Sequence, residues 1–141
     1  MSEILIDHVL LDRVTKAAKE SPRLRMNYNF HESLSSPSQR LLNALEPGTV
    51  LPIHRHRHTA ETYVLLRGRM RVLFYDDDKK EINRYELDPA EGTYGVNIPR
   101  GQWHTIEVLC AGTVIFEVKD GPYIPIAPNA VSYTHLRAHE T

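Results

Sequence analysis

The sequence predicts an all-β domain, a barrel or jelly roll, preceded by one short helix. From residue 39 to residue 119, about eight short apolar segments alternate with turn residues every eight to twelve positions. No long helix separates these segments, so parallel βαβ units do not fit the pattern. The 141 residues are enough to bury one core of this kind and too few for two.

The N-terminal segment predicts an amphipathic helix over residues 7–20. Apolar side chains recur there at helical spacing. Ser21-Pro22 ends the helix, because the residue before a proline avoids the helical conformation. Residues 23–38 are irregular, with one short strand around Tyr28. Residues 1–38 are therefore expected to form a helix and a segment that covers the barrel.

The predicted strands follow in order, each bounded by turn residues. They cover residues 39–45, 50–56, 62–67, 69–75, 82–87, 94–98, 103–109 and 113 onward. Turn chemistry separates them, as in Glu46-Pro47-Gly48 and in the charged segment 76–80. Residues 39–120 are therefore expected to form the barrel itself.

The C-terminal part of the chain divides into two segments. Residues 121–131 contain Pro122, Pro125 and Pro128, which exclude a central strand, so we expect an extended strap over the surface. Residues 132–141 have weak periodicity and no clear packing face. They predict a disordered tail or an extension foreign to the natural protein, so His135 and His139 are not expected to contribute to function.

Composition excludes several classes of protein. The 17 Lys and Arg residues against 18 Asp and Glu residues leave no global field for nucleic acid or an anionic membrane. No stretch is long enough for a membrane span, and the acidic N-terminus does not match a secretory signal. Cys110 is the only cysteine, which excludes an internal disulfide framework and fits a cytoplasmic location.

Histidine is the residue type that points to chemistry, because three of the eight histidines lie within residues 54–58. His54 and His56 are two residues apart on a predicted strand, so their imidazoles are expected on one face. Glu61 and His104 can return to that face. Three imidazoles and one carboxylate suit one divalent transition metal, with iron, manganese, nickel, zinc and copper left open. A His-x-His pair alone is as often an exposed pair on an edge strand.

The spacing of these residues resembles the first motif of the cupin family, whose fixed positions are matched by Gly48, His54, His56, Glu61 and Gly68. The segment PRGQWH, which ends at His104, is similar to the second cupin motif. Gly92 is displaced by one position from that motif, and Val108 stands where it has asparagine. The resemblance implies a cupin jelly-roll barrel with the three histidines and Glu61 as metal ligands.

A closer resemblance, to the WbuC family, runs from about residue 26 to residue 123. It is carried by RMNYNFHES, QRLLNALEPGT, HRHRHTAET, VLFYDDD, IPRGQWHT and FEVKDGPY. WbuC proteins are small cupin metalloproteins associated with bacterial O-antigen gene clusters, and no well-defined reaction comes with the family. Cupins often pair through sheet faces, so family analogy implies a homodimer.

The resemblance implies a metalloenzyme that acts on a sugar-derived or carboxylated small molecule in O-antigen or surface-polysaccharide metabolism. The metal would polarise a substrate oxygen or, if it is iron, bind dioxygen, so a metal-dependent isomerase and a dioxygenase are both open. His58 and Tyr63 are the candidate proton carriers. His58 is otherwise a solvated loop histidine, and Tyr63 a core residue or a partner of the metal ligands.

Two other functions stay open. One is a non-catalytic module whose metal coordinates a sugar acid or stabilises the barrel. The other is a metal-independent deoxysugar epimerase, which requires a histidine–aspartate pair that no aspartate in the sequence clearly supplies. Arg55 and Arg57 are expected on a solvated face, with binding of a phosphate as the alternative. Asn43, polar in a partly buried segment, either lines the pocket or joins a structural network.

Overall fold

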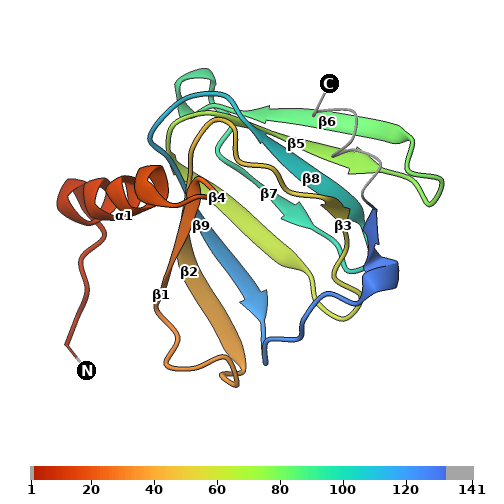
Figure 1. The fold of residues 1–141 in the computed structure, drawn as a ribbon, viewed down its shortest axis with the longest axis horizontal. Helices are drawn as coiled ribbons and strands as arrows, with labels where there is room; N and C mark the ends of the chain where they lie inside the picture. Colours follow the sequence, from red (N-terminus) through yellow and green to blue (C-terminus); the bar gives the residue numbers. More distant parts are fainter. Residues whose placement is uncertain (1, 133–141) are drawn as a thin grey trace.

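Two five-stranded antiparallel sheets face each other in the computed structural model, which describes residues 2–132 (Figure 1). In order across the first sheet lie β1 (Arg25–Asn29), β2 (Ser38–Leu45), β9 (Thr113–Asp120), β4 (Glu61–Arg67) and β7 (Gly95–Ile98). In order across the second lie β10 (Val131–Ser132), β3 (Ile53–His54), β8 (Trp103–Val108), β5 (Met70–Tyr75) and β6 (Glu81–Leu87). This arrangement is the predicted all-β jelly roll.

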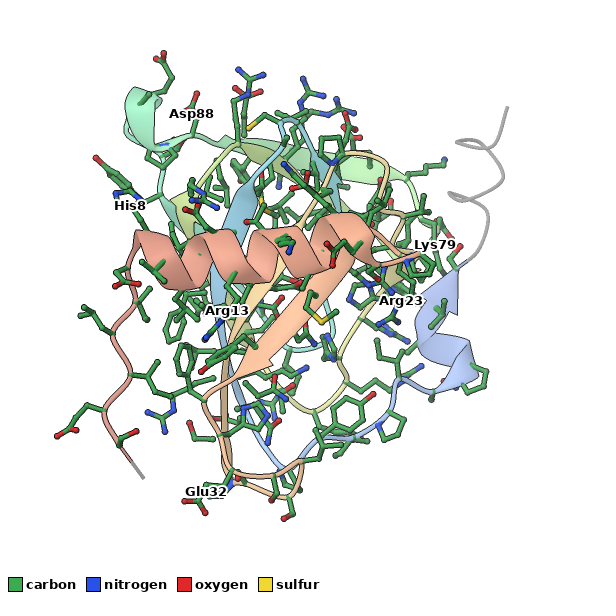
Figure 2. The ribbon with its side chains drawn as sticks, turned by 60° about the vertical axis from the view of Figure 1, so that its left-hand side comes forward. His8, Arg13, Arg23, Glu32, Lys79 and Asp88 are labelled. Atoms are coloured by element: carbon green, nitrogen blue, oxygen red, sulfur yellow. The ribbon has the colours of Figure 1, made fainter. Side chains whose placement is uncertain are left out.

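Helix α1 (His8–Glu20) lies on the outside of the first sheet, and Figure 2 shows it crossing the molecule with Arg13 on its visible side. Asp7 caps the helix by accepting a hydrogen bond from the Leu10 backbone N–H at 3.0 Å. Its buried face packs against apolar side chains of β2 and β9, including Leu42 and Val114. The helix predicted over residues 7–20 is therefore confirmed, with Asp7 as its cap rather than its first residue.

The core between the sheets changes character along the barrel. On β4, inward positions run from apolar Leu65 through Tyr63 to the carboxyl group of Glu61. On β8, apolar Ile106 is followed two positions away by His104. Strand alternation keeps these residues on one face. One end of the barrel is therefore a closed apolar core and the other end holds polar side chains.

The tight turn after β4 requires glycine at its first position, Gly68. Its φ is +95°, and a Cβ atom at this position would lie 2.5 Å from the Cα of Thr113. A side chain would therefore meet both an unfavourable left-handed backbone conformation and another strand.

The predicted strand over residues 50–56 is wrong in its extent. The structure forms a strand only at Ile53–His54, between β8 and β10. Pro52 has no backbone N–H to donate to a ladder, and the chain leaves the sheet after His54. His56 therefore lies in a loop, where its carbonyl accepts a hydrogen bond from the Gly101 N–H at 2.8 Å.

The proline-rich segment crosses from the end of β9 to the edge of the second sheet (Figure 1). The N–H groups of Gly121 and Tyr123 donate to the carbonyls of Pro37 and Leu34, and the short helix η2 (Pro128–Ala130) leads into edge strand β10. Of the predicted tail, only Ser132 belongs to the described residues, and His135 and His139 lie outside them. Within residues 2–132, no helix has the length and apolar character needed to cross a membrane.

Candidate metal centre

Three histidines converge at the polar end of the barrel. His54 on β3 and His104 on β8 are directly paired across neighbouring strands, and their ring centroids are 4.3 Å apart. The loop after β3 brings the ring of His56 to 5.3 Å from that of His54. One ring nitrogen from each histidine lies within 4.8 Å of the other two. The three side chains therefore form a candidate site for a divalent metal.

Backbone carbonyls hold two of these rings in the form that binds metal. The Nδ1 atoms of His54 and His104 lie 2.9 Å from the carbonyl oxygens of Pro52 and Gln102, respectively. A carbonyl only accepts, so each Nδ1 carries the proton and each Nε2 presents a lone pair. Burial, followed by the neighbouring His104, lowers the pKa of His54 to about 3 and keeps it neutral. These contacts orient both histidines before any ligand arrives.

Glu61, the first residue of β4, supplies a buried carboxylate to the same cluster. Its Oε2 lies 3.0 Å from the Nε2 of His56, and its Oε1 lies 3.3 Å from the Nε2 of His104. Oε1 also accepts a hydrogen bond from the Tyr63 hydroxyl. Burial acts to raise the pKa of Glu61, but positive charge at the Nε2 atoms of His104 and His56 holds it well below its usual value. Where those nitrogens carry lone pairs, a bound cation would supply that charge.

The donor set fits a metal on its own geometry. The Nε2 atom of His104 is buried and has no hydrogen-bond partner among the described residues. Because Nδ1 of this ring carries the proton, Nε2 and the carboxylate of Glu61 are two acceptors facing each other. A cation bound by both groups would satisfy them, whereas a buried acceptor without a donor or a cation is costly. Imidazole nitrogens with a carboxylate oxygen are ligands that divalent transition metals accept.

The four residues proposed from the sequence are thus brought together, although one of them arrives by a different route. Strand alternation does not place His56 beside His54, because His56 lies in the loop. His58 stands apart on the exposed part of the same loop. Tyr63 is buried against Glu61, and burial followed by the charge of Glu61 raises the pKa of its hydroxyl well above the usual value. Tyr63 therefore acts as a hydrogen-bond donor that holds Glu61.

Sequence reasoning missed a second carboxyl group in the barrel, that of Glu117. It lies two residues beyond the core residue Ile115 on β9, so strand alternation from Ile115 was the signal that could have found it. The Nδ2 of Asn43 donates to Glu117 Oε1 at 2.9 Å, while the buried Oδ1 of Asn43 has no partner among residues 2–132. Burial, followed by the charge of Glu61, raises the pKa of Glu117.

A pocket opens beside the partly exposed ring of His56. Its walls are residues 55–59 of the loop after β3, Lys119 and Asp120 at the end of β9, and residues of the proline-rich strap. The guanidinium of Arg55 stacks on Trp103, 4.5 Å from the centroid of its ring. Trp103 itself packs with Ile53, away from His104, as the alternation of β8 predicts. The candidate metal centre therefore borders a cavity at the mouth of the barrel.

Comparisons with known proteins identify the fold. A family profile described as "Domain of unknown function (DUF6016)" matches residues 6–87, and no curated protein matches the chain. The capsular polysaccharide assembling protein CapF from Staphylococcus aureus has a TM-score of 0.59 at 21% identity, over 72% of this chain and 29% of CapF. KdgF from Halomonas sp. has a TM-score of 0.57 at 13% identity, over 74% of this chain and 85% of KdgF.

A variant of oxalate decarboxylase OxdC from Bacillus subtilis is also similar, with a TM-score of 0.55 at 20% identity over 72% of this chain and 26% of OxdC. The chain thus spans less than a third of CapF and of OxdC. All three proteins have the cupin fold, and at these identities the likeness concerns the fold alone. The predicted cupin jelly roll is confirmed, and with its histidine cluster the chain is a cupin-fold protein with a candidate divalent-metal site.

Proposed function

The chain belongs to the DUF6016 family, a domain of unknown function, and we propose that it is a cupin metalloprotein with His54, His56, Glu61 and His104 as ligands of one divalent transition metal. One observation carries this proposal. The buried Nε2 of His104 lacks a hydrogen-bond partner in the described chain and faces the carboxylate of Glu61. A metal ion between these acceptors accounts for an arrangement that would otherwise be unfavourable.

We further propose that the protein acts on a sugar-derived or carboxylated small molecule in O-antigen or surface-polysaccharide metabolism. The sequence segments shared with the WbuC family support this setting, and the capsule-assembly description of CapF is consistent with it. The pocket beside His56 gives such a molecule access to the metal centre. We also propose a cytoplasmic location, which the single cysteine of the sequence, Cys110, supports.

The chain's own residues have distinct roles in this proposal. The carbonyls of Pro52 and Gln102 orient His54 and His104, and the Tyr63 hydroxyl holds Glu61. The metal, when bound, supplies Lewis-acid polarisation of a ligand oxygen, and redox chemistry if it is iron. His58, exposed at the wall of the pocket, is the candidate group to carry a proton to or from the bound molecule. Either an isomerisation or an oxidation would use the metal, its oriented ligands and His58.

A non-catalytic binding module is the second candidate, and the state of Tyr63 favours it. Its hydroxyl is buried and bonded to Glu61, so it is not available to take a proton from a substrate. The metal-independent epimerase gains no support. Among residues 2–132, the partners of the clustered histidines are backbone carbonyls and Glu61, where that mechanism needs an aspartate.

Metal content tests the proposed site directly. We expect about one metal per chain, measured by elemental mass spectrometry, in protein purified without an affinity-tag metal. His54→Ala and His104→Ala should lose the metal because each removes an oriented imidazole. His58→Ala is the matched control, since it removes a histidine of the same loop that lies outside the cluster. Full metal content in both cluster variants, or none in the wild type after anaerobic reconstitution, would contradict the proposal.

We also propose that the chain forms a homodimer, and the N-terminal arm supports this. Residues 4–6 extend away from the barrel in both views, and the apolar side chain of Leu5 is 75% exposed (Figures 1 and 2). Val9, on the first turn of α1, is 73% exposed and continues the apolar surface. A second copy of the chain that covers this arm would remove its apolar surface from water.

A further inference from the structure

We propose that the pocket beside His56 binds the anionic group of the ligand, a carboxylate or a phosphate, through Arg57 and Lys119. The inference rests on the proposed metal site and adds the chemical class of the molecule that reaches it. It predicts that a neutral molecule of the same shape does not bind, because the pocket selects charge as well as size.

Lys119 connects the pocket with the metal centre. It is the cross-strand neighbour of Glu61, since these two residues are paired between β9 and β4. It lies on the same face of β9 as Glu117, two residues earlier, and its ammonium group is 5.7 Å from the ring centroid of Tyr123 on the strap. One side chain therefore reaches from the strand that borders Glu61 to the outer wall of the pocket.

Two of the three Arg and Lys residues that line the pocket have no carboxylate partner within residues 2–132. Neither Arg57 nor Lys119 has a carboxylate within 4.0 Å in the described part of the chain. Arg55, in contrast, is paired with Asp77 at 3.8 Å and stacked on Trp103. Asp120 is the one acidic residue among those that line the pocket. The lining of the pocket thus contains two positive groups without a carboxylate of the described residues within 4.0 Å and one acidic residue, which favours an anion.

The opposite wall of the pocket is apolar and held in place from both ends. Tyr123, Ile124 and Ile126 of the strap line it and are exposed. The Tyr123 N–H donates to the Leu34 carbonyl at 2.7 Å, and the Ala130 carbonyl accepts from the Arg55 N–H at 3.0 Å. The wall therefore exists before a ligand binds. It suits a compact body with an apolar face, such as a sugar ring, that carries a single anionic group.

The test compares three probes that share one ring, namely glucuronate, glucose 1-phosphate and glucose, titrated by calorimetry into metal-loaded protein. The two anions distinguish a carboxylate from a phosphate as the recognised group, and binding of at least one of them without binding of glucose supports the inference. Arg57→Gln and Lys119→Gln should each weaken anion binding about tenfold or more, because each removes a charged hydrogen-bond donor. The matched control is the Lys19→Gln/Arg23→Gln pair, which removes the same charges from exposed positions outside the pocket.

Metal content of every variant is measured in parallel, which separates this inference from the proposed metal site. Unchanged metal content together with lost anion binding in Arg57→Gln or Lys119→Gln supports the pocket. Equal binding of glucose, no binding of either anion, or an equal loss in the control pair would overturn it. Protein that contains no metal but still binds an anion through Arg57 and Lys119 would overturn only the metal proposal.

Discussion

Tyr63→Phe removes one hydroxyl group from the candidate metal centre and leaves the volume of the core almost unchanged. The hydroxyl donates to Oε1 of Glu61, and both side chains are buried. Phenylalanine keeps the ring in the apolar core beside Leu65 but cannot donate. The variant therefore tests whether the position of the Glu61 carboxylate depends on the Tyr63 hydroxyl.

The expected magnitude follows from this one contact. A hydrogen bond to a charged acceptor contributes about 1.5–3 kcal/mol, and its loss leaves a buried carboxylate oxygen with one donor fewer. Part of that free energy is also lost in the metal-free protein, where Glu61 is still buried. We therefore expect metal affinity to fall about tenfold, within the range found when an outer partner of a metal ligand is removed. The remainder should appear as a lower melting temperature of the metal-free protein.

Two measurements check this reasoning. Competition with a chelator gives the metal dissociation constant, and calorimetry gives the melting temperature of the metal-free protein. Tyr94→Phe is the matched control, because it removes the same hydroxyl from an exposed tyrosine just before β7, at the end of that strand opposite the partner of Glu61. If Tyr63→Phe binds metal as tightly as the wild type and melts at the same temperature, Tyr63 does not hold Glu61.

Three further predictions concern the fold, the barrel interior and the assembly. Gly68→Ala should lower the free energy of unfolding by more than about 1–2 kcal/mol, because it adds a steric clash with Thr113 to the cost of a positive φ. Gly92→Ala is the control, since its φ is +82° and nothing lies within 4 Å of the added Cβ. In the same denaturant titration it should show the cost of the backbone conformation alone. Glu117→Gln should stabilise metal-free protein at pH 7. Because the pKa of Glu117 is raised in the folded state, the carboxyl favours folding most at low pH, where it is protonated in both the folded and the unfolded protein. Wild-type stability then falls as pH rises through the unfolded and the folded pKa. An equal gain in stability at pH 3 and pH 7 would contradict a raised pKa for Glu117. Deleting residues 2–6 should convert a dimer to a monomer in light scattering, and an unchanged mass would exclude the arm as the interface.

Local signals in the sequence were enough for most of the secondary structure. Helical spacing and Pro22 bounded α1, and turn residues bounded seven of the strands to within a residue or two, apart from the far end of β9. The failure at residues 50–56 has a local cause as well. Pro52 interrupts the ladder, and an apolar-polar alternation alone does not reveal where a strand leaves its sheet.

The sequence by itself determined the fold class and the four candidate ligands, because turn residues, strand periodicity and motif spacing are properties of neighbouring residues. Only the tertiary structure decided which distant side chains meet. Asn43 and Glu117 are 74 residues apart and touch because β2 and β9 pair in one register. Likewise, Lys119 lies next to Glu61 across the strands, and beside the strap, only because β9 pairs with β4. The register between distant strands depends on how whole faces pack, so a local pattern cannot specify it.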